Sequence, residues 1–288
     1  MWSVILLREN LVWSLISNFE LLTSNAFFVD KLKNEFQDKK NQGDNVVTTL
    51  DTNLQEAAYD ALGSNKGAVV VMDPSTGKIL AMVSKPDFDP NTVSQNWNEL
   101  STSEDSVLLN RATQGQYAPG STFKIVAATA GVMEGVVGAY DTINCTGKFQ
   151  LIPPDVNCWI YSERYKSGSH GPLTLSQAIK ESCNFYFNTV GYMLGKTSDF
   201  TNLTPETDAD GNVVQSSTYN DAQAISTLTK YAAMYGFDAN TGIEIDETAP
   251  HVSTADGART ANGTGRQYLY DQPAFTLCGN DRKQWNLL

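Results

Sequence analysis

Two apolar runs flank a short polar segment early in the chain. Residues 68–72 and 79–83 are apolar, whereas Asp73–Gly77 between them contains residue types typical of turns. An apolar–turn–apolar pattern of this kind predicts a β-hairpin. Just before it, Gln55–Leu62 favours a helix, and Gly63 is the residue type that most often ends one.

The later part of the chain favours helices. The stretch from Pro86 to Gln116 predicts a long loop, and residues 121–236 then predict a mainly helical region. Within that region, Asp221–Tyr235 places apolar side chains near helical spacing. Because strands come first and helices follow without regular alternation, the pattern predicts an α+β fold with an antiparallel sheet.

The most informative segment is Pro119–Lys124, where a proline–glycine break precedes the apolar residues 123–128. Residues three apart share one face of a helix, so Ser121 and Lys124 are predicted to lie side by side. A serine hydroxyl becomes a good nucleophile when a neighbouring base takes its proton, and a buried lysine can be that base. The segment therefore predicts a nucleophile and its base. The alternative is that Ser121 only caps the helix.

A second Ser-x-x-Lys string, Ser75–Lys78, lies in the predicted hairpin turn. In a turn the serine and the lysine do not share a helix face, so we interpret this copy as structural. The helical context, rather than the string itself, distinguishes Ser121.

A further polar pair separates two apolar, helix-like segments. Ser182–Asn184 follows residues 173–180 and precedes residues 185–194. Between two helices, the serine can relay a proton while the asparagine amide holds a lysine and a substrate amide. The alternative is a helix junction with polar caps.

Together these segments resemble the transpeptidase domain of the penicillin-binding proteins. The likeness covers roughly residues 44–252. It includes an opening strand and helix at Val46–Gln55, the hairpin, the segment Pro119–Lys124 and the pair of Ser182 and Asn184. Since nothing in the chain resembles a glycosyltransferase module, it is closer to the monofunctional class B enzymes. The resemblance implies a penicillin-binding protein/serine β-lactamase-like fold, in which helices flank an antiparallel sheet and the nucleophile helix is buried beside it.

The resemblance also implies roles for four side chains. Ser121 is the nucleophile, Lys124 is its base, Ser182 takes part in proton transfer, and Asn184 contacts the substrate. The family's third motif, Lys-Thr-Gly on an edge strand, has no match. The nearest string, Lys196–Ser198, is predicted to be a helix C-terminus.

The implied activity is the cross-linking of peptidoglycan stem peptides through an acyl-serine intermediate, without a cofactor. The implied partners are stem peptides, β-lactams, and cell-wall synthesis or division proteins, at the outer face of the bacterial cytoplasmic membrane. Two alternatives stay open: a serine β-lactamase or β-lactam sensor domain, and a binding relic that keeps the fold without chemistry.

The ends of the chain depart from the family pattern. We expect residues 1–43 to form an N-terminal extension and linker, with no evident signal or membrane anchor, and residues 44–288 to form the transpeptidase domain. The tail after about residue 266 has no clear periodicity, and the chain stops before a Lys-Thr-Gly strand. We therefore expect a truncated product with an altered reading frame near its end, and doubt that it completes the reaction.

Charge and composition exclude some classes of partner and ligand. The net charge of −12 and the pI of about 4.6 argue against nucleic acid and against anionic membrane surfaces. Cys145 and Cys158 could form a disulfide or remain buried thiols, and Cys183 simply suits the second polar pair. With no Cys-x-x-Cys pair and only His170 and His251 available, no metal site is expected.

Overall fold

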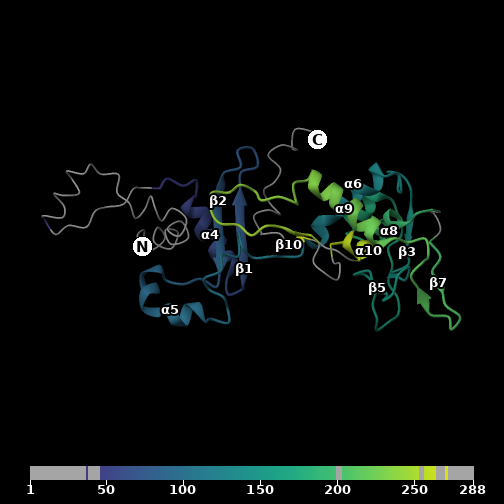
Figure 1. The fold of residues 1–288 in the computed structure, drawn as a ribbon, viewed down its shortest axis with the longest axis horizontal. Helices are drawn as coiled ribbons and strands as arrows, with labels where there is room; N and C mark the ends of the chain where they lie inside the picture. The colour runs from purple at the N-terminus through teal and green to yellow at the C-terminus, as the bar shows by residue number, and fades with distance from the viewer. Residues whose placement is uncertain (1–36, 38–45, 199–202, 253–255, 264–269, 272–288) are drawn as a thin grey trace. The chain divides into compact units, whose positions relative to one another are not determined.

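The protein consists of two compact units. The computed structural model describes residues 37, 46–198, 203–252, 256–263 and 270–271. Of these, residues 37, 46–115 and 240–248 belong to the first unit, and the second comprises the described parts of 116–239 and 249–272. Figure 1 labels helices and strands of both units where there is room.

The first unit is built on the predicted hairpin. Its elements are α4 (Thr52–Leu62), β1 (Gly67–Met72), β2 (Ile79–Lys85), η1 (Pro90–Thr92) and α5 (Val93–Ser101). β1 and β2 pair antiparallel, with Gly67 opposite Lys85. Ala81 and Val83 on β2 pack with Ala58 on α4, so the helix and the hairpin share a small core.

The turn and the helix ends follow the sequence signals. The Asp73 carboxylate accepts hydrogen bonds from the hydroxyls of Ser75 and Thr76, which confirms that the first Ser-x-x-Lys string is a hairpin turn. The Asp51 side chain caps the start of α4 by accepting from two backbone N–H groups. Gly63 follows its end with a φ of 57°, as predicted.

Two predictions for this unit are wrong. Residues 46–50 form no strand, and the segment contacts β2 through a 2.6 Å hydrogen bond from the Thr49 hydroxyl to the Ile79 carbonyl. The predicted loop of residues 86–116 contains η1 and α5. No residue of α5 is buried, but Val93, Trp97 and Leu100 recur at helical spacing, so a signal for this helix was present in the sequence and was missed.

The second unit is mainly helical, with short strand pairs between the helices. Its helices are η2 (Gly120–Phe123), α6 (Lys124–Met133), α7 (Leu175–Lys180), α8 (Asn184–Gly195), α9 (Asp221–Met234) and α10 (Gly257–Thr260). Its strands are β3 (Ile143–Cys145), β4 (Lys148–Phe149), β5 (Val156–Asn157), β6 (Gly171–Leu173), β7 (Glu206–Thr207), β8 (Val213–Val214), β9 (His251–Val252) and β10 (Tyr270–Asp271). They pair as β3–β6, β4–β5, β7–β8 and β9–β10.

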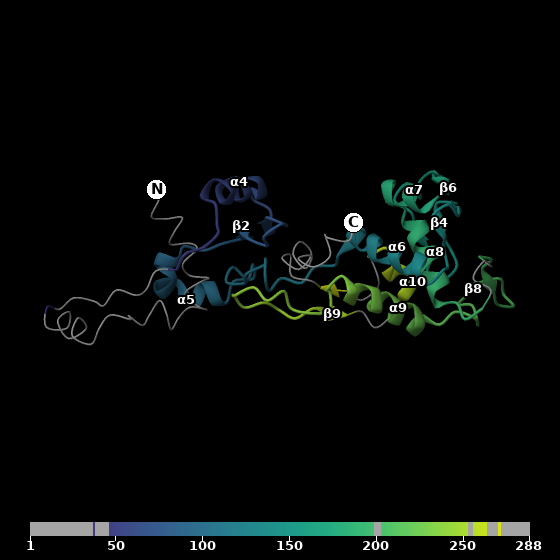
Figure 2. The same ribbon diagram turned by 90° about the horizontal axis from the view of Figure 1, so that it is seen from above.

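Helix α8 forms the centre of this unit. Every residue from Tyr186 to Gly195 is buried, and α6, α9 and α10 pack against the helix (Figure 2). Gly191 permits the approach of α10, because a Cβ there would lie 2.7 Å from the Ala258 carbonyl oxygen. Burying a large apolar side chain such as Phe187 contributes about 1.5–3 kcal/mol to the stability of the folded unit. Because α6 packs against α8, the packing also holds the first residues of the two helices close together.

The fold class is α+β, as predicted, and every strand pair within the described residues is antiparallel. The expected extension over residues 1–43 lies outside the described residues except for Gln37, as does the tail beyond residue 266 except for Tyr270–Asp271. The boundary at residue 44 stays a prediction. No helix in the described part is both long and apolar enough to cross a bilayer.

Candidate active site

Ser121 and Lys124 lie where η2 passes into α6. Gly120, with a φ of 59°, provides the turn before them. The Ser121 side chain is exposed, whereas Lys124 is only 2% exposed. Lys124 Nζ lies 3.2 Å from Ser121 Oγ, so an accessible hydroxyl adjoins a buried amine, as the sequence predicted.

The second predicted pair lies at the junction of α7 and α8. Ser182 adopts a φ of 49°, and Cys183 caps α8 by accepting a 3.4 Å hydrogen bond from the Tyr186 N–H. Asn184 is the first residue of that helix. The bend directs both polar side chains back towards the amine of Lys124.

All four predicted residues meet at one point. Lys124 Nζ contacts Ser182 Oγ at 3.0 Å, the Ser182 carbonyl oxygen at 2.8 Å and Asn184 Oδ1 at 2.7 Å. Ser182 Oγ in turn lies 3.1 Å from Ser121 Oγ. The alternative interpretation of these residues as simple helix caps does not account for this convergence, since Cys183 is the cap of α8.

The acceptors around Lys124 suit a neutral amine. A neutral amine has two N–H groups and one lone pair, and two of its partners, the Ser182 carbonyl and Asn184 Oδ1, can only accept. Those partners take both N–H groups, which leaves the lone pair for a serine hydroxyl. The arrangement can therefore remove a proton from Ser121, directly or through Ser182.

Burial moves Lys124 towards that neutral form. Desolvation lowers the pKa of Lys124 from 10.5 to about 8, and nearby negative charge at Cys158 and Cys183 opposes part of the shift. About a tenth of the amine is then uncharged at pH 7, far more than at the ordinary pKa, and the uncharged form is the one that a general base requires.

Gly263 is a further residue of this region that the sequence did not single out for a role. It lies just beyond α10 with a φ of 84°, and a Cβ at this position would lie 1.8 Å from the Gly120 carbonyl oxygen. Only glycine fits there without displacing the residue that precedes Ser121. The segment Thr260–Gly265 contains two glycines, and this was the signal for Gly263 that the sequence offered.

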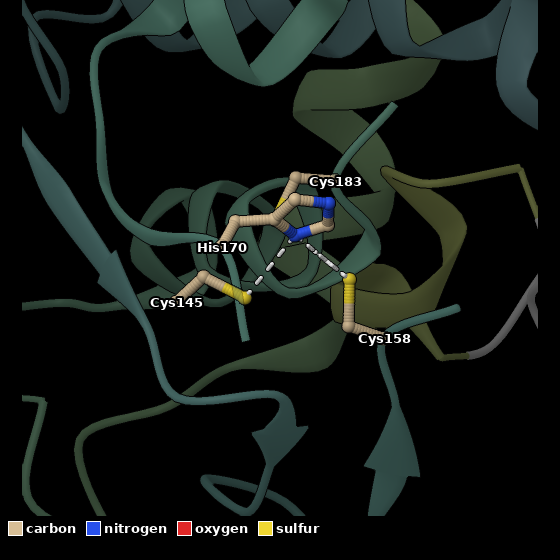
Figure 3. A group of neighbouring side chains, drawn as sticks. All are labelled: Cys145, Cys158, His170 and Cys183. Atoms are coloured by element: carbon tan, nitrogen blue, oxygen red, sulfur yellow. Dashed lines mark hydrogen bonds between the residues drawn. The ribbon is translucent and has the colours of Figure 1, made fainter. Parts of the chain in front are cut away.

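Three cysteines and a histidine also gather in this unit, which the spacing argument missed. Cys145, Cys158 and Cys183 are buried free thiols, and His170 lies among them (Figure 3). Hydrogen bonds from the other two thiols hold the pKa of Cys158 well below its usual range. The four side chains come from separate loops and strand ends, so no short motif revealed them. We call them the Cys3His cluster.

A serine hydroxyl, a buried lysine one turn away and a serine–asparagine pair at the start of the neighbouring helix form the arrangement typical of Ser-x-x-Lys proteins. A family model described as the penicillin binding protein transpeptidase domain matches residues 67–267. The chain belongs to this family, which confirms the resemblance seen in the sequence.

Two similar peptidoglycan transpeptidases agree with this assignment. The chain is 35% identical over 184 residues to the peptidoglycan D,D-transpeptidase PbpA of Mycolicibacterium smegmatis, covering 58% of this chain and 36% of the relative. It is 35% identical over 158 residues to the peptidoglycan D,D-transpeptidase MrdA of Escherichia coli, covering 53% and 24%. The chain thus spans about a third or less of the length of these relatives.

A solved structure shows the same fold. The penicillin G acyl-enzyme complex of penicillin-binding protein A from M. tuberculosis matches with a TM-score of 0.62 at 25% identity. The match covers 90% of this chain and 57% of that one. That protein forms a covalent adduct with penicillin G.

Proposed function

We propose that this chain carries the acyl-serine site of a peptidoglycan D,D-transpeptidase. The observation that supports it is the convergence on Lys124 Nζ of Ser121 Oγ, Ser182 Oγ and Asn184 Oδ1. In this proposal Ser121 is the nucleophile, Lys124 its base, Ser182 a proton relay, and Asn184 a substrate contact.

The first half-reaction forms an acyl-enzyme. Ser121 Oγ attacks the carbonyl carbon of the peptide bond before a terminal D-alanine, while its proton passes to Lys124 Nζ. The C–N bond then breaks, and the proton moves through Ser182 to the departing D-alanine amine. Backbone N–H groups at the start of η2 and α6 would stabilise the oxyanion formed on the way.

The second half-reaction transfers the acyl group. The amine of a neighbouring stem peptide attacks the ester carbonyl, a new amide bond forms, and the bond between the acyl carbon and Ser121 Oγ breaks. The proton lost by the amine returns to Ser121 through the same residues. A penicillin enters by the first step only, because its opened ring stays attached and blocks the incoming amine.

Because the proposed substrate is a peptidoglycan stem peptide, we propose that the reaction takes place at the outer face of the cytoplasmic membrane. We propose cell-wall synthesis or division proteins as partners, since the relatives PbpA and MrdA are named as peptidoglycan transpeptidases.

The experiment is intact mass measurement of the full chain after incubation with benzylpenicillin. We expect the mass to rise by one penicillin in the unmodified chain and in Ser75→Ala, whose serine lies in the hairpin turn. We expect no rise in Ser121→Ala. An adduct that survives Ser121→Ala, or no adduct on folded protein, would refute the proposal. Rapid turnover of penicillin would instead assign the β-lactamase alternative.

A further inference from the structure

The short helix α10 and the residues that follow it contact both elements that carry the proposed catalytic groups. Residues 257–263 are all buried, and α10 packs against α8 (Figure 1). We call residues 261–263 the α10 turn. Its first contact is with the start of η2, where Gly263 lies against the Gly120 carbonyl, directly before Ser121.

The second contact of the α10 turn is with α8, and two buried amides make it. The Asn262 side chain donates a hydrogen bond from Nδ2 to Asn188 Oδ1. Asn188 is 0% exposed and Asn262 is 1% exposed. Asn188 lies four residues after Asn184 on α8, so the two side chains share a face of the helix. The α10 turn is therefore bonded to α8 one helical turn from the amide that contacts Lys124 Nζ.

Backbone hydrogen bonds hold these two contacts at a fixed separation. The Gly263 N–H donates to the Thr260 carbonyl at 2.8 Å, and the Asn262 N–H donates to the Arg259 carbonyl at 3.2 Å. The other end of α10 is held as well, because the Asp221 carboxylate accepts two 2.7 Å hydrogen bonds from backbone N–H groups there. The α10 turn is therefore a stiff connection between α8 and η2.

Packing alone does not account for an amide pair at this place. Gly191 and Ala258 show that α8 and α10 can approach closely without polar side chains. Asn188 Nδ2 is buried and has no hydrogen-bond partner among the described residues. A buried donor without a partner lowers the stability of the folded unit. What the pair provides is one directional bond that fixes the α10 turn on α8 in a single position.

We propose that the hydrogen bond between Asn262 and Asn188 positions Ser121 for acyl transfer. The bond fixes the α10 turn on α8, and the turn holds Gly120, the residue before Ser121. The 3.1 Å distance from Ser121 Oγ to Ser182 Oγ then depends on this bond. Both amides are positioning residues that act through the backbone. The effect on the reaction rests on the proposed function, whereas the effect on the place of Ser121 does not.

Three variants of the full chain separate positioning from packing, because leucine has the branched shape of asparagine without its polar atoms. Asn188→Leu and Asn262→Leu each leave one buried amide without its partner, so the melting temperature and the acylation rate should both fall. The double variant removes both amides, so its melting temperature should return to that of the unmodified chain or above. Its rate of acylation by a fluorescent penicillin should stay about 10–100-fold low, because Ser121 is no longer held in place.

Thr189→Val is the matched control. Thr189 is also buried in α8, and its hydroxyl donates to the Phe185 carbonyl of the same helix at 2.9 Å. The variant removes a buried polar group of α8 and leaves the amide pair intact, so it should be acylated at the rate of the unmodified chain. A pair that only stabilises the fold predicts that the rate recovers with the melting temperature. A double variant that is both stable and acylated at the unmodified rate would therefore overturn the proposal.

Asn262→Ala covers the case in which the double variant fails to fold. It deletes the same hydrogen bond by shortening one side chain, and it can be assayed well below its own melting temperature. We expect the same 10–100-fold loss of acylation rate in the folded protein. An unchanged rate in this variant would also overturn the proposal.

Hydrogen exchange tests the position of Ser121 without acylation. In the double variant and in Asn262→Ala, the amides of residues 121–126 should exchange faster than in the unmodified chain, while those of α4 in the other unit should not change. Unchanged exchange at residues 121–126 in either folded variant would contradict the positioning role. An unmodified chain that is never acylated would refute the proposed function, and the exchange rates alone would then decide whether the amide pair holds Ser121.

Discussion

The acidity of Lys124 gives the sharpest quantitative prediction, and Asn184→Asp is the change that tests it. With a pKa of about 8, about 9% of the amine is neutral at pH 7 and about 90% at pH 9. At the ordinary value of 10.5, only about 0.03% would be neutral at pH 7, so burial increases the active form about 300-fold.

The substitution adds a negative charge where the amide oxygen now lies 2.7 Å from Lys124 Nζ. An opposite charge at this distance favours the protonated amine, and raises the pKa of Lys124 by at least about one unit. The rate depends on the neutral form, so the rise of rate with pH should move to higher pH. At pH 7 the neutral fraction should fall about ten-fold or more.

The assay is the rate of acylation by a fluorescent penicillin between pH 6 and pH 10. The unmodified chain should gain about ten-fold from pH 7 to pH 9, with a midpoint near pH 8. The midpoint, not the plateau, is the readout, because the amide also contacts the substrate in our proposal. Asn98→Asp adds the same charge to the exposed helix α5 and serves as the control. A midpoint that stays near pH 8 in Asn184→Asp would refute Lys124 as the base.

Three further changes have defined outcomes. Ser182→Ala should slow acylation about 10²–10⁴-fold by removing the relay, with an unchanged far-UV circular dichroism spectrum; a rate near that of the unmodified chain would exclude the relay. Gly263→Ala should slow acylation because its Cβ would collide with the Gly120 carbonyl, and an unaffected rate would contradict this contact. Phe187→Ala should lower the free energy of unfolding by about 3–5 kcal/mol in urea titrations, and a loss under 1 kcal/mol would contradict its place in the core.

The sequence predicted those parts of the site that local structure controls. Ser121 and Lys124 share a turn, and Ser182 and Asn184 share a helix junction, so short-range periodicity was enough to pair each set. Their meeting at Lys124 Nζ depends on the packing of α6 against α8, which the family resemblance implied and periodicity alone could not.

The features that the sequence did not predict also depend on packing between distant segments. Helix α5 has no buried residue, and its three apolar side chains, Val93, Trp97 and Leu100, were too few to outweigh the polar residues around them. Residues 46–50 have a β-like sequence but no strand pairing in the structure. The Cys3His cluster assembles from Cys145, Cys158, His170 and Cys183, whose separations along the chain match no short ligand motif. Long-range packing decides each of these features.

The most direct test of the account is the position of the penicillin adduct. Trypsin places the candidate serines on three different peptides, residues 67–78 for Ser75, 112–124 for Ser121 and 181–196 for Ser182. Tandem mass spectrometry of the acylated full chain should find the adduct on the 112–124 peptide, at Ser121. An adduct on either of the other peptides, or none on folded protein, would contradict the central claim.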